Sequence, residues 1–167
     1  MTLILMGPAG SGKSTIGRAL AARLQWHFID ADDLHDASAK AKMSAGMALT
    51  DADRRPWLQA IREAIVAHRH SGRPLVCACS ALTREYRRLL AQDDPDVHFL
   101  YLDGPAELLA ARLRQRQGHF FAPPLLESQL DLLQPPQADE AMVLDIRRPP
   151  EAIVDQIVQH LSTKKGP

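Results

Sequence analysis

Short apolar runs alternate along the chain with longer segments in which apolar and polar residues mix. The apolar runs have the length of buried strands and lie at 3–6, 26–29, 75–79, 97–102 and 142–145. The mixed segments have the pattern of helices and lie at about 15–24, 34–43, 51–68, 83–90, 105–115, 125–133 and 150–161. This alternation predicts an α/β fold of three layers, α/β/α, with a five-stranded parallel sheet and a small helical lid.

The longest predicted helix begins between Asp51 and Pro56. Trp57, Ile61 and Ile65 fall on one face of it at helical spacing, so this face is expected to be buried. Proline lacks a backbone N–H and clashes with the preceding turn, so we expect Pro56 to lie in the first turn of the helix.

The composition is that of a single globular domain, residues 1–167, with 46% hydrophobic residues. Twenty basic and twenty acidic residues cancel, which argues against a general nucleic-acid or anionic-membrane binder. No apolar run has membrane-spanning length, and the first predicted strand lies where a signal peptide would be. The only cysteines, Cys77 and Cys79, have poor spacing for zinc and are expected to be reduced and buried. We therefore expect a soluble cytoplasmic protein.

Residues 7–14, GPAGSGKS, match G-x-x-x-x-G-K-[ST], the phosphate-binding P-loop, between a predicted strand and a predicted helix. Glycines let the loop turn its N–H groups onto phosphate oxygens, and the helix N-terminus adds unpaired donors. Lys13 is predicted to reach the β- and γ-phosphates of ATP, and the Ser14 hydroxyl to bind Mg²⁺. Pro8 removes one N–H from the loop. The predicted nucleotide-binding residues here are Gly7, Ala9, Gly10, Ser11, Gly12, Lys13, Ser14 and Thr15.

Two carboxylates, Asp30 and Asp32, follow the second predicted strand. Ligands of parallel sheets bind beyond the carboxyl ends of the strands, so this pair is expected near the P-loop. One carboxylate can help to hold Mg²⁺, and the other can accept the proton of a substrate hydroxyl. The central strand ends without an acidic residue, which makes Asp30 the better metal partner. The structural alternative is a helix N-cap, a role that suits Asp33.

Several arginines lie at positions where an anionic ligand would balance their charge. Arg54 follows two aspartates at a helix start, where a cation is unfavourable unless its guanidinium binds an anion such as a carboxylate. After the central strand, Ser80 is predicted to face the site. Arg84 or Arg87 is predicted to touch the substrate, and the alternative is that both lie on a solvated helix face.

Arg112 and Arg116 lie four residues apart on one predicted helix face, with no acidic residue nearby in the sequence. A phosphate group would resolve their repulsion, and an arginine that closes over the γ-phosphate stabilises the transition state. The glycine and prolines that follow bound a segment typical of a lid, over about 112–133. His119 is predicted to be a lid or substrate contact rather than a base.

Together these motifs resemble those of gluconokinases of the small P-loop type, which are relatives of shikimate and nucleoside monophosphate kinases. The resemblance covers nearly the whole chain. Beyond the P-loop it rests on DADDLH at 30–35, KMSAG at 42–46, LTDADRRPWL at 49–58, CSAL at 79–82, YR at 86–87, RLRQRQGHF at 112–120 and SQ at 128–129. The DxDRxPWL and GHF blocks are not features of shikimate kinases, which carry three glycines where this chain has CSA.

The resemblance implies ATP-dependent phosphorylation of D-gluconate at its 6-hydroxyl, with Mg²⁺. By similarity, Asp32 is the base or hydroxyl anchor, Arg54 holds gluconate, and Arg112 and Arg116 close over ATP. The implied sugar contacts are His35, Asp53, Arg84, Arg87, His119 and Gln129. Family members are commonly homodimers, and the substrate-binding helical segment is expected at about 32–70.

Three departures from the family pattern stand out, and none removes a residue with an assigned chemical role. Pro8-Ala9 replace Val-Ser, Ala39 replaces Asn, and Gln134 replaces Glu. Two other functions stay open: a P-loop kinase of another acceptor, such as a shikimate-like hydroxy acid or a nucleoside monophosphate, and a non-enzymatic nucleotide-binding switch. The paired aspartates and the arginine-rich lid argue against the switch.

Overall fold

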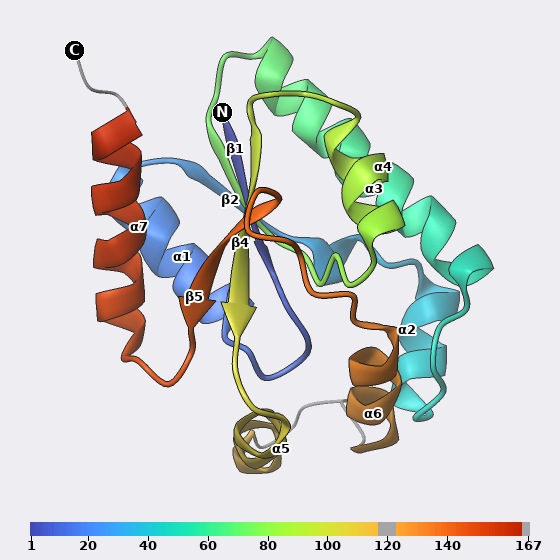
Figure 1. Cartoon of the computed structure of the whole chain (residues 1–167). Coiled ribbons are helices and arrows are strands. Elements are labelled where there is room, and N and C mark those ends of the chain that lie inside the picture. The colour runs from blue at the N-terminus through green and yellow to red at the C-terminus, as the bar shows by residue number, and fades with distance from the viewer. Residues whose placement is uncertain (117–122, 165–167) are drawn as a thin grey trace.

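The computed structural model describes residues 1–116 and 123–164, and within them it confirms the parallel five-stranded sheet (Figure 1). The strand order is β2-β3-β1-β4-β5, and all four pairings are parallel. The strands are β1 (Thr2–Met6), β2 (His27–Asp30), β3 (Leu75–Ala78), β4 (Val97–Asp103) and β5 (Ala141–Asp145). The first strand of the chain is therefore the central one.

Helices cover both faces of the sheet and gather at one end of it. In Figure 1, α1 (Lys13–Leu24) and α7 (Pro150–Lys164) lie on one face, and α3 (Asp51–His70) and α4 (Arg84–Ala91) lie on the other. The remaining elements lie beyond the carboxyl ends of the strands. They are the 3₁₀ turn η1 (Ala31–Leu34), α2 (Ala37–Ser44), α5 (Ala106–Gln115) and α6 (Pro123–Leu132).

The alternation of side chains along β1 divides the core into two halves. Leu3 and Leu5 pack on the side of α1 and α7, whereas Ile4 and Met6 pack on the side of α3 and α4. All four side chains are fully buried, as expected for a central parallel strand. Cys77 and Cys79 are free thiols in the second of these halves, which confirms their predicted burial.

The predicted helix over 34–43 is wrong in its first turn. The chain forms η1, then turns at His35, and α2 begins only at Ala37. The cap of α2 is Asp36, whose Oδ1 accepts from the N–H of Ala39 at 2.7 Å. Asp33 therefore does not cap this helix, because the short 3₁₀ turn ends before the helix starts.

Thr50 and Asp53 form a capping box at the start of α3. The Thr50 hydroxyl accepts from Asp53 N at 3.2 Å, and the Asp53 carboxylate accepts from Thr50 N at 2.9 Å. This cap starts the helix at Asp51, so Pro56 lies in the second turn and not in the first as predicted. Among the described residues, no helix is both long enough and apolar enough to cross a membrane.

Candidate active site

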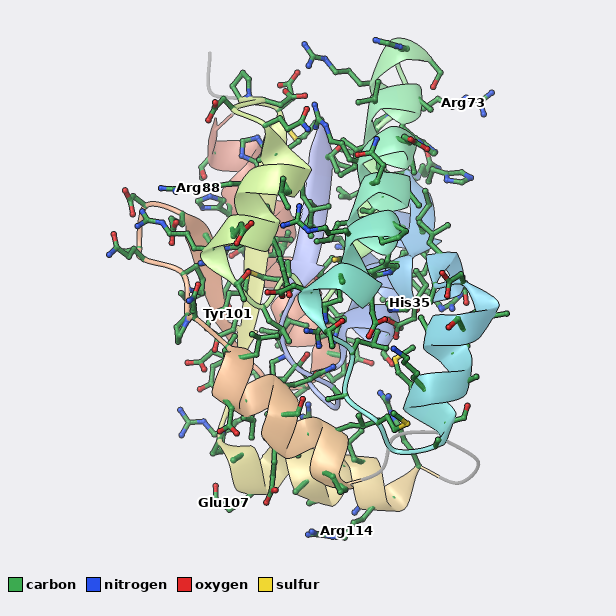
Figure 2. All side chains as sticks on the ribbon, turned by 90° about the vertical axis from the view of Figure 1, so that its right-hand side faces the viewer. His35, Arg73, Arg88, Tyr101, Glu107 and Arg114 are labelled. Atoms are coloured by element: carbon green, nitrogen blue, oxygen red, sulfur yellow. The ribbon has the colours of Figure 1, made fainter. Side chains whose placement is uncertain are left out.

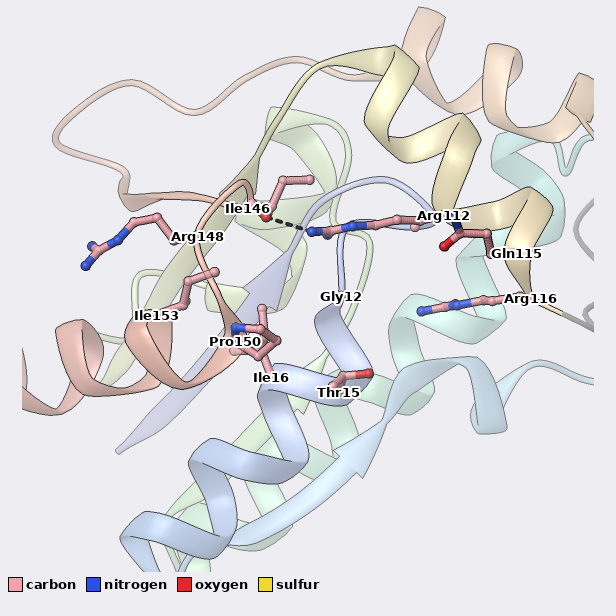
Figure 3. A pocket seen from close by; sticks show the side chains of 11 residues that line it. Gly12, Thr15, Ile16, Arg112, Gln115, Arg116, Ile146, Arg148, Pro150 and Ile153 are labelled. Carbon is pink, nitrogen blue, oxygen red and sulfur yellow. Dashed lines mark hydrogen bonds between the residues drawn. The ribbon is translucent and has the colours of Figure 1, made fainter.

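Two cavities meet at the P-loop. One, of about 350 Å³, lies between the start of α1, the last turn of α5 and the loop after β5 (Figure 3). The other, of about 630 Å³, lies between the P-loop, η1, α2, the start of α3 and α6. Gly10, Gly12 and Arg116 line both cavities. We call the first the nucleotide cavity and the second the acceptor cavity, for reasons that follow from their linings.

The P-loop offers backbone donors between the two cavities. Gly7 N–H donates to Ser80 O at 3.1 Å, which ties the start of the loop to the segment after β3. In contrast, the N–H groups of Gly10, Gly12 and Lys13 make no hydrogen bond within the described residues. Gly10 has a φ of 83°, and a Cβ there would lie 2.8 Å from Leu109 O, so only glycine brings the loop this close to α5. Such free N–H groups at a helix start suit phosphate oxygens.

Lys13 lies inside the loop, and its Nζ donates to Pro8 O at 3.0 Å. Burial is the main cause that lowers the pKa of Lys13, and the charge of Asp32 opposes this shift. Lys13 is partly exposed to the cavity and lies near carboxylates, so an incoming phosphate would supply a further charge partner.

Ser14 and Asp30 are in direct contact, since the Ser14 hydroxyl donates to Asp30 Oδ2 at 2.5 Å. Arg18 approaches the same carboxylate at 4.0 Å. The described residues contain no cluster of three metal-ligating side chains. A hydroxyl next to one carboxylate nevertheless fits Mg²⁺, which keeps several waters and completes its shell with substrate phosphates.

Asp32 lies at the mouth of the acceptor cavity and is exposed. Its backbone N–H donates to Asp30 Oδ1 at 3.1 Å, which fixes the turn that carries both aspartates. Its own carboxylate makes no hydrogen bond or ion pair within the described part of the chain. Asp32 is thus free to accept a proton or a hydrogen bond from a ligand in this cavity.

His35 forms one wall of the acceptor cavity and is only 8% exposed. Its ring stacks on Trp57 with centroids 4.4 Å apart, and Trp57 Nε1 donates to Ala31 O at 2.6 Å. Figure 2 shows His35 near the start of α3 and beside α2. Burial lowers the pKa of His35, whereas the charge of Asp32 opposes this shift. The ring is therefore a neutral hydrogen-bonding group at neutral pH.

Two cations from α2 and α3, Lys40 and Arg54, line the same cavity. Arg54 contacts Tyr86, whose hydroxyl lies 3.5 Å from Arg54 Nη1 and donates in turn to Asp51. Arg54 makes no ion pair within 4 Å among the described side chains, and neither does Lys40 of α2, which also lines the cavity. Two unpaired cations beside a free carboxylate suit a ligand that carries both an anionic group and a hydroxyl.

The nucleotide cavity has a different lining. Arg112 of α5 and Arg116, which directly follows this helix, project into it, and Arg112 Nη2 donates to Ile146 O at 2.7 Å (Figure 3). Thr15 lines the cavity from α1, Arg148 lines it from the loop after β5, and Pro150 lines it from the start of α7. Among the described residues, no carboxylate belongs to this lining. The cavity therefore suits a polyanion with an attached apolar group.

Three predicted substrate contacts lie outside both cavities. Asp53 pairs with Lys42 at 2.8 Å, and this partner together with the capping hydrogen bonds lowers the pKa of Asp53 to about 2. Arg84 pairs with Glu140 at 2.9 Å. Arg87 is only 4% exposed, and its guanidinium lies 3.4 Å from Glu140 and donates to backbone carbonyls around it. All three side chains therefore have charged protein partners in the structure, and their predicted contacts with the substrate stay predictions.

The other predicted residues fall near the P-loop or outside the described residues. Ser80 and Gln129 line the acceptor cavity, and Gln129 Oε1 accepts from Ala9 N at 2.8 Å. His119 lies outside the described residues, with the middle of the predicted lid.

Sequence reasoning missed Lys40 and the loop with Arg148 and Pro150. The place of that loop, directly after the last strand, was a usable signal, because ligands bind at this edge of the sheet. Lys40 carried no such signal.

Comparison with known proteins places the chain in a family. The shikimate kinase family profile matches residues 9–162. The thermoresistant gluconokinase of Escherichia coli (strain K12) is 40% identical over 98% of this chain and 93% of that protein. A gluconokinase of Arabidopsis thaliana is 39% identical over 99% of this chain and 94% of that protein.

Solved structures agree with this placement. A gluconokinase from Sinorhizobium meliloti 1021 superposes with a TM-score of 0.83 at 36% identity, covering 99% of this chain and 97% of that chain. An unliganded sugar kinase from Janibacter sp. HTCC2649 gives a TM-score of 0.90 at 41% identity, covering 96% of this chain and 94% of that chain. The shikimate kinase from Aquifex aeolicus vf5, at 17% identity and a TM-score of 0.62 over 98% of both chains, shares the fold.

Proposed function

The chain belongs to the gluconokinases, within the shikimate kinase family, and we propose that it transfers the γ-phosphoryl group of ATP to the 6-hydroxyl of D-gluconate. The observation that carries the proposal is one P-loop shared by two cavities of unlike charge. A phosphoryl group held by this loop is within reach of ligands on both sides.

In this proposal ATP occupies the nucleotide cavity, with its phosphates on the free N–H groups of the loop. Arg112 and the Arg148–Pro150 loop flank the space for the nucleoside. Ser14 and Asp30 would hold Mg²⁺, which neutralises charge on the phosphates when bound. Lys13 exchanges its contact with Pro8 O for a phosphate oxygen.

D-Gluconate fits the acceptor cavity because it carries a hydroxyl at one end and a carboxylate at the other. Asp32 orients the 6-hydroxyl and takes its proton as the new P–O bond forms. Arg54 binds the carboxylate, with Lys40 as a second cation. Arg116 lines both cavities, so it stabilises the charge that develops on the transferred group. Closing the cavity over the reactants excludes water, which would otherwise hydrolyse ATP.

The test is ADP release by the purified protein with ATP and Mg²⁺, measured alone and with D-gluconate, shikimate or AMP. We expect stimulation by gluconate only, and no stimulated release from Lys13→Ala. Stimulation by shikimate or AMP equal to that by gluconate would assign another acceptor. ATP binding without stimulation by any of the three would favour a nucleotide-dependent switch.

The expectations of a homodimer and of a cytoplasmic location belong to the same proposal. They rest on the resemblance to the gluconokinases. Sedimentation of the purified protein at several concentrations tests the first, and a single species with the mass of one chain would overturn it.

A further inference from the structure

The side chain of Gln129 joins α6 to the P-loop across 120 residues of sequence. Its Oε1 accepts from Ala9 N at 2.8 Å. Gly7 N–H is already bonded to Ser80 O, and Pro8 has no N–H. The N–H of Ala9 is therefore the first in the loop that does not bond to the segment after β3, and α6 supplies its partner.

The hydrogen-bonding partner fixes the orientation of the Gln129 amide. A backbone N–H can only donate, so Gln129 must present its oxygen to Ala9. The amino group is then the other end of the amide, and it makes no hydrogen bond within the described residues. Because Gln129 lines the acceptor cavity, this amino group offers two N–H donors to a ligand there.

The helix that carries Gln129 is anchored on both sides of it. Leu125 and Leu126 are buried, with exposures of 4% and 6%. Beyond the helix, Gln134 N donates to Leu82 O at 2.9 Å, next to the segment that binds Gly7. The Gln129 amide thus links α6 to the P-loop, so a ligand that accepts from its amino group also acts on the contact with Ala9.

We propose that Gln129 is a positioning residue that couples the two substrates. Its carbonyl oxygen holds the P-loop, and its amino group donates to an oxygen of the acceptor, so each substrate raises the affinity for the other. The identity of the acceptor rests on the proposed function. Such coupling is reciprocal, because the same free energy links both binding equilibria.

The test measures the affinity of a non-hydrolysable ATP analogue by calorimetry, with and without saturating D-gluconate. We expect gluconate to tighten analogue binding about 5-fold or more in the wild type, the lower end of typical coupling. In Gln129→Leu, which has neither acceptor nor donor, we expect this ratio to fall to about 1. Gln129→Glu keeps an oxygen for Ala9 but has no donor, so its ratio should also fall.

The matched control is Glu127→Gln, which changes an exposed side chain on the same helix outside both cavities. It should keep the wild-type ratio, and the thermal midpoints of all variants show whether each one folds. A purely structural role for Gln129 would lower stability or both affinities without changing the ratio. A wild-type ratio in Gln129→Leu, or a ratio of about 1 in the wild type, would overturn the proposal.

A failure of the proposed function gives a different result. In that case the wild type neither binds nor phosphorylates gluconate, and the loop contact is tested by the analogue alone. The affinity of Gln129→Leu for the analogue should then differ several-fold from that of the wild type. Equal affinities would overturn the role of Gln129 as well.

Discussion

The nucleotide cavity and the acceptor cavity share the P-loop but differ in the charges that line them. The first is lined by arginines and by glycines of the loop, and none of the described residues that line it is a carboxylate. The second is lined by Asp30, Asp32 and Asp33 as well as by cations. A site that only holds a polyanion needs one sign of charge, whereas a site that also takes up a proton needs both.

The two cavities also differ in the elements that line them. Besides Gly10 and Gly12 of the P-loop, the nucleotide cavity is lined from α1, α5, the loop after β5 and the start of α7. The acceptor cavity is lined from η1, α2, α3 and α6 as well as from the P-loop. Substitutions of residues that line only one cavity should therefore separate the two sides.

The largest expected effect is that of Asp32→Asn. The amide cannot take the proton of the hydroxyl, so kcat should fall about 10²- to 10⁴-fold. ATP affinity should stay within about 2-fold, because Asp32 does not line the nucleotide cavity. Steady-state kinetics and ATP binding measure the two effects. A near-wild-type kcat would remove Asp32 from the role of base.

The next effect is that of Arg54→Met on the acceptor. Loss of a charge-assisted hydrogen bond of about 1.5–3 kcal/mol should raise the KM for gluconate about 10- to 100-fold. The KM for ATP should change little. The matched control is Arg55→Met, which removes an exposed arginine that lines neither cavity. Equal effects of both variants would mean that only net charge matters.

Arg112→Met tests the nucleotide cavity. The KM for ATP should rise about 10-fold while the KM for gluconate stays constant, because Arg112 lines only the nucleotide cavity. Arg114→Met, on an exposed face of the same helix, should leave both constants unchanged. A rise in the KM for gluconate alone would contradict the assignment of the two cavities.

The smallest expected effect is the pH dependence of stability that His35 contributes. Burial lowers the pKa of His35 below 6.5, so the unfolded chain binds the proton first as the pH falls. This contribution is complete above pH 6.5 and is lost as the pH falls toward the folded pKa. Urea unfolding at pH 7.5 and 5.5 should show a smaller loss in His35→Phe than in the wild type.

The exposed His70 provides the control for this measurement. His70→Gln should keep the pH dependence of the wild type. An unchanged pH dependence in His35→Phe would assign it to other groups.

The P-loop and the order of elements could be predicted because local sequence determines them, and the closeness of Asp30 to the P-loop could be predicted from the parallel sheet. A glycine-rich turn between a strand and a helix has few other conformations, and strand ends meet at one edge of the sheet. The partners of Arg84, Arg87 and Asp53 could not be predicted. Arg84 and Arg87 meet Glu140, more than 50 residues away, and Lys42 reaches Asp53 because the chain turns between α2 and α3.

The central place of β1 also affects how the protein is made. The strand leaves the ribosome before the other four strands, but its partners are β3 and β4, paired with Thr2 through Leu75 and Val97. At a synthesis rate of about 5–20 residues per second, the apolar side chains of β1 stay without their second partner, β4, for on the order of 5–20 seconds. During biosynthesis the P-loop therefore takes its final form late, and a chaperone that covers the emerging strand would protect the future nucleotide site.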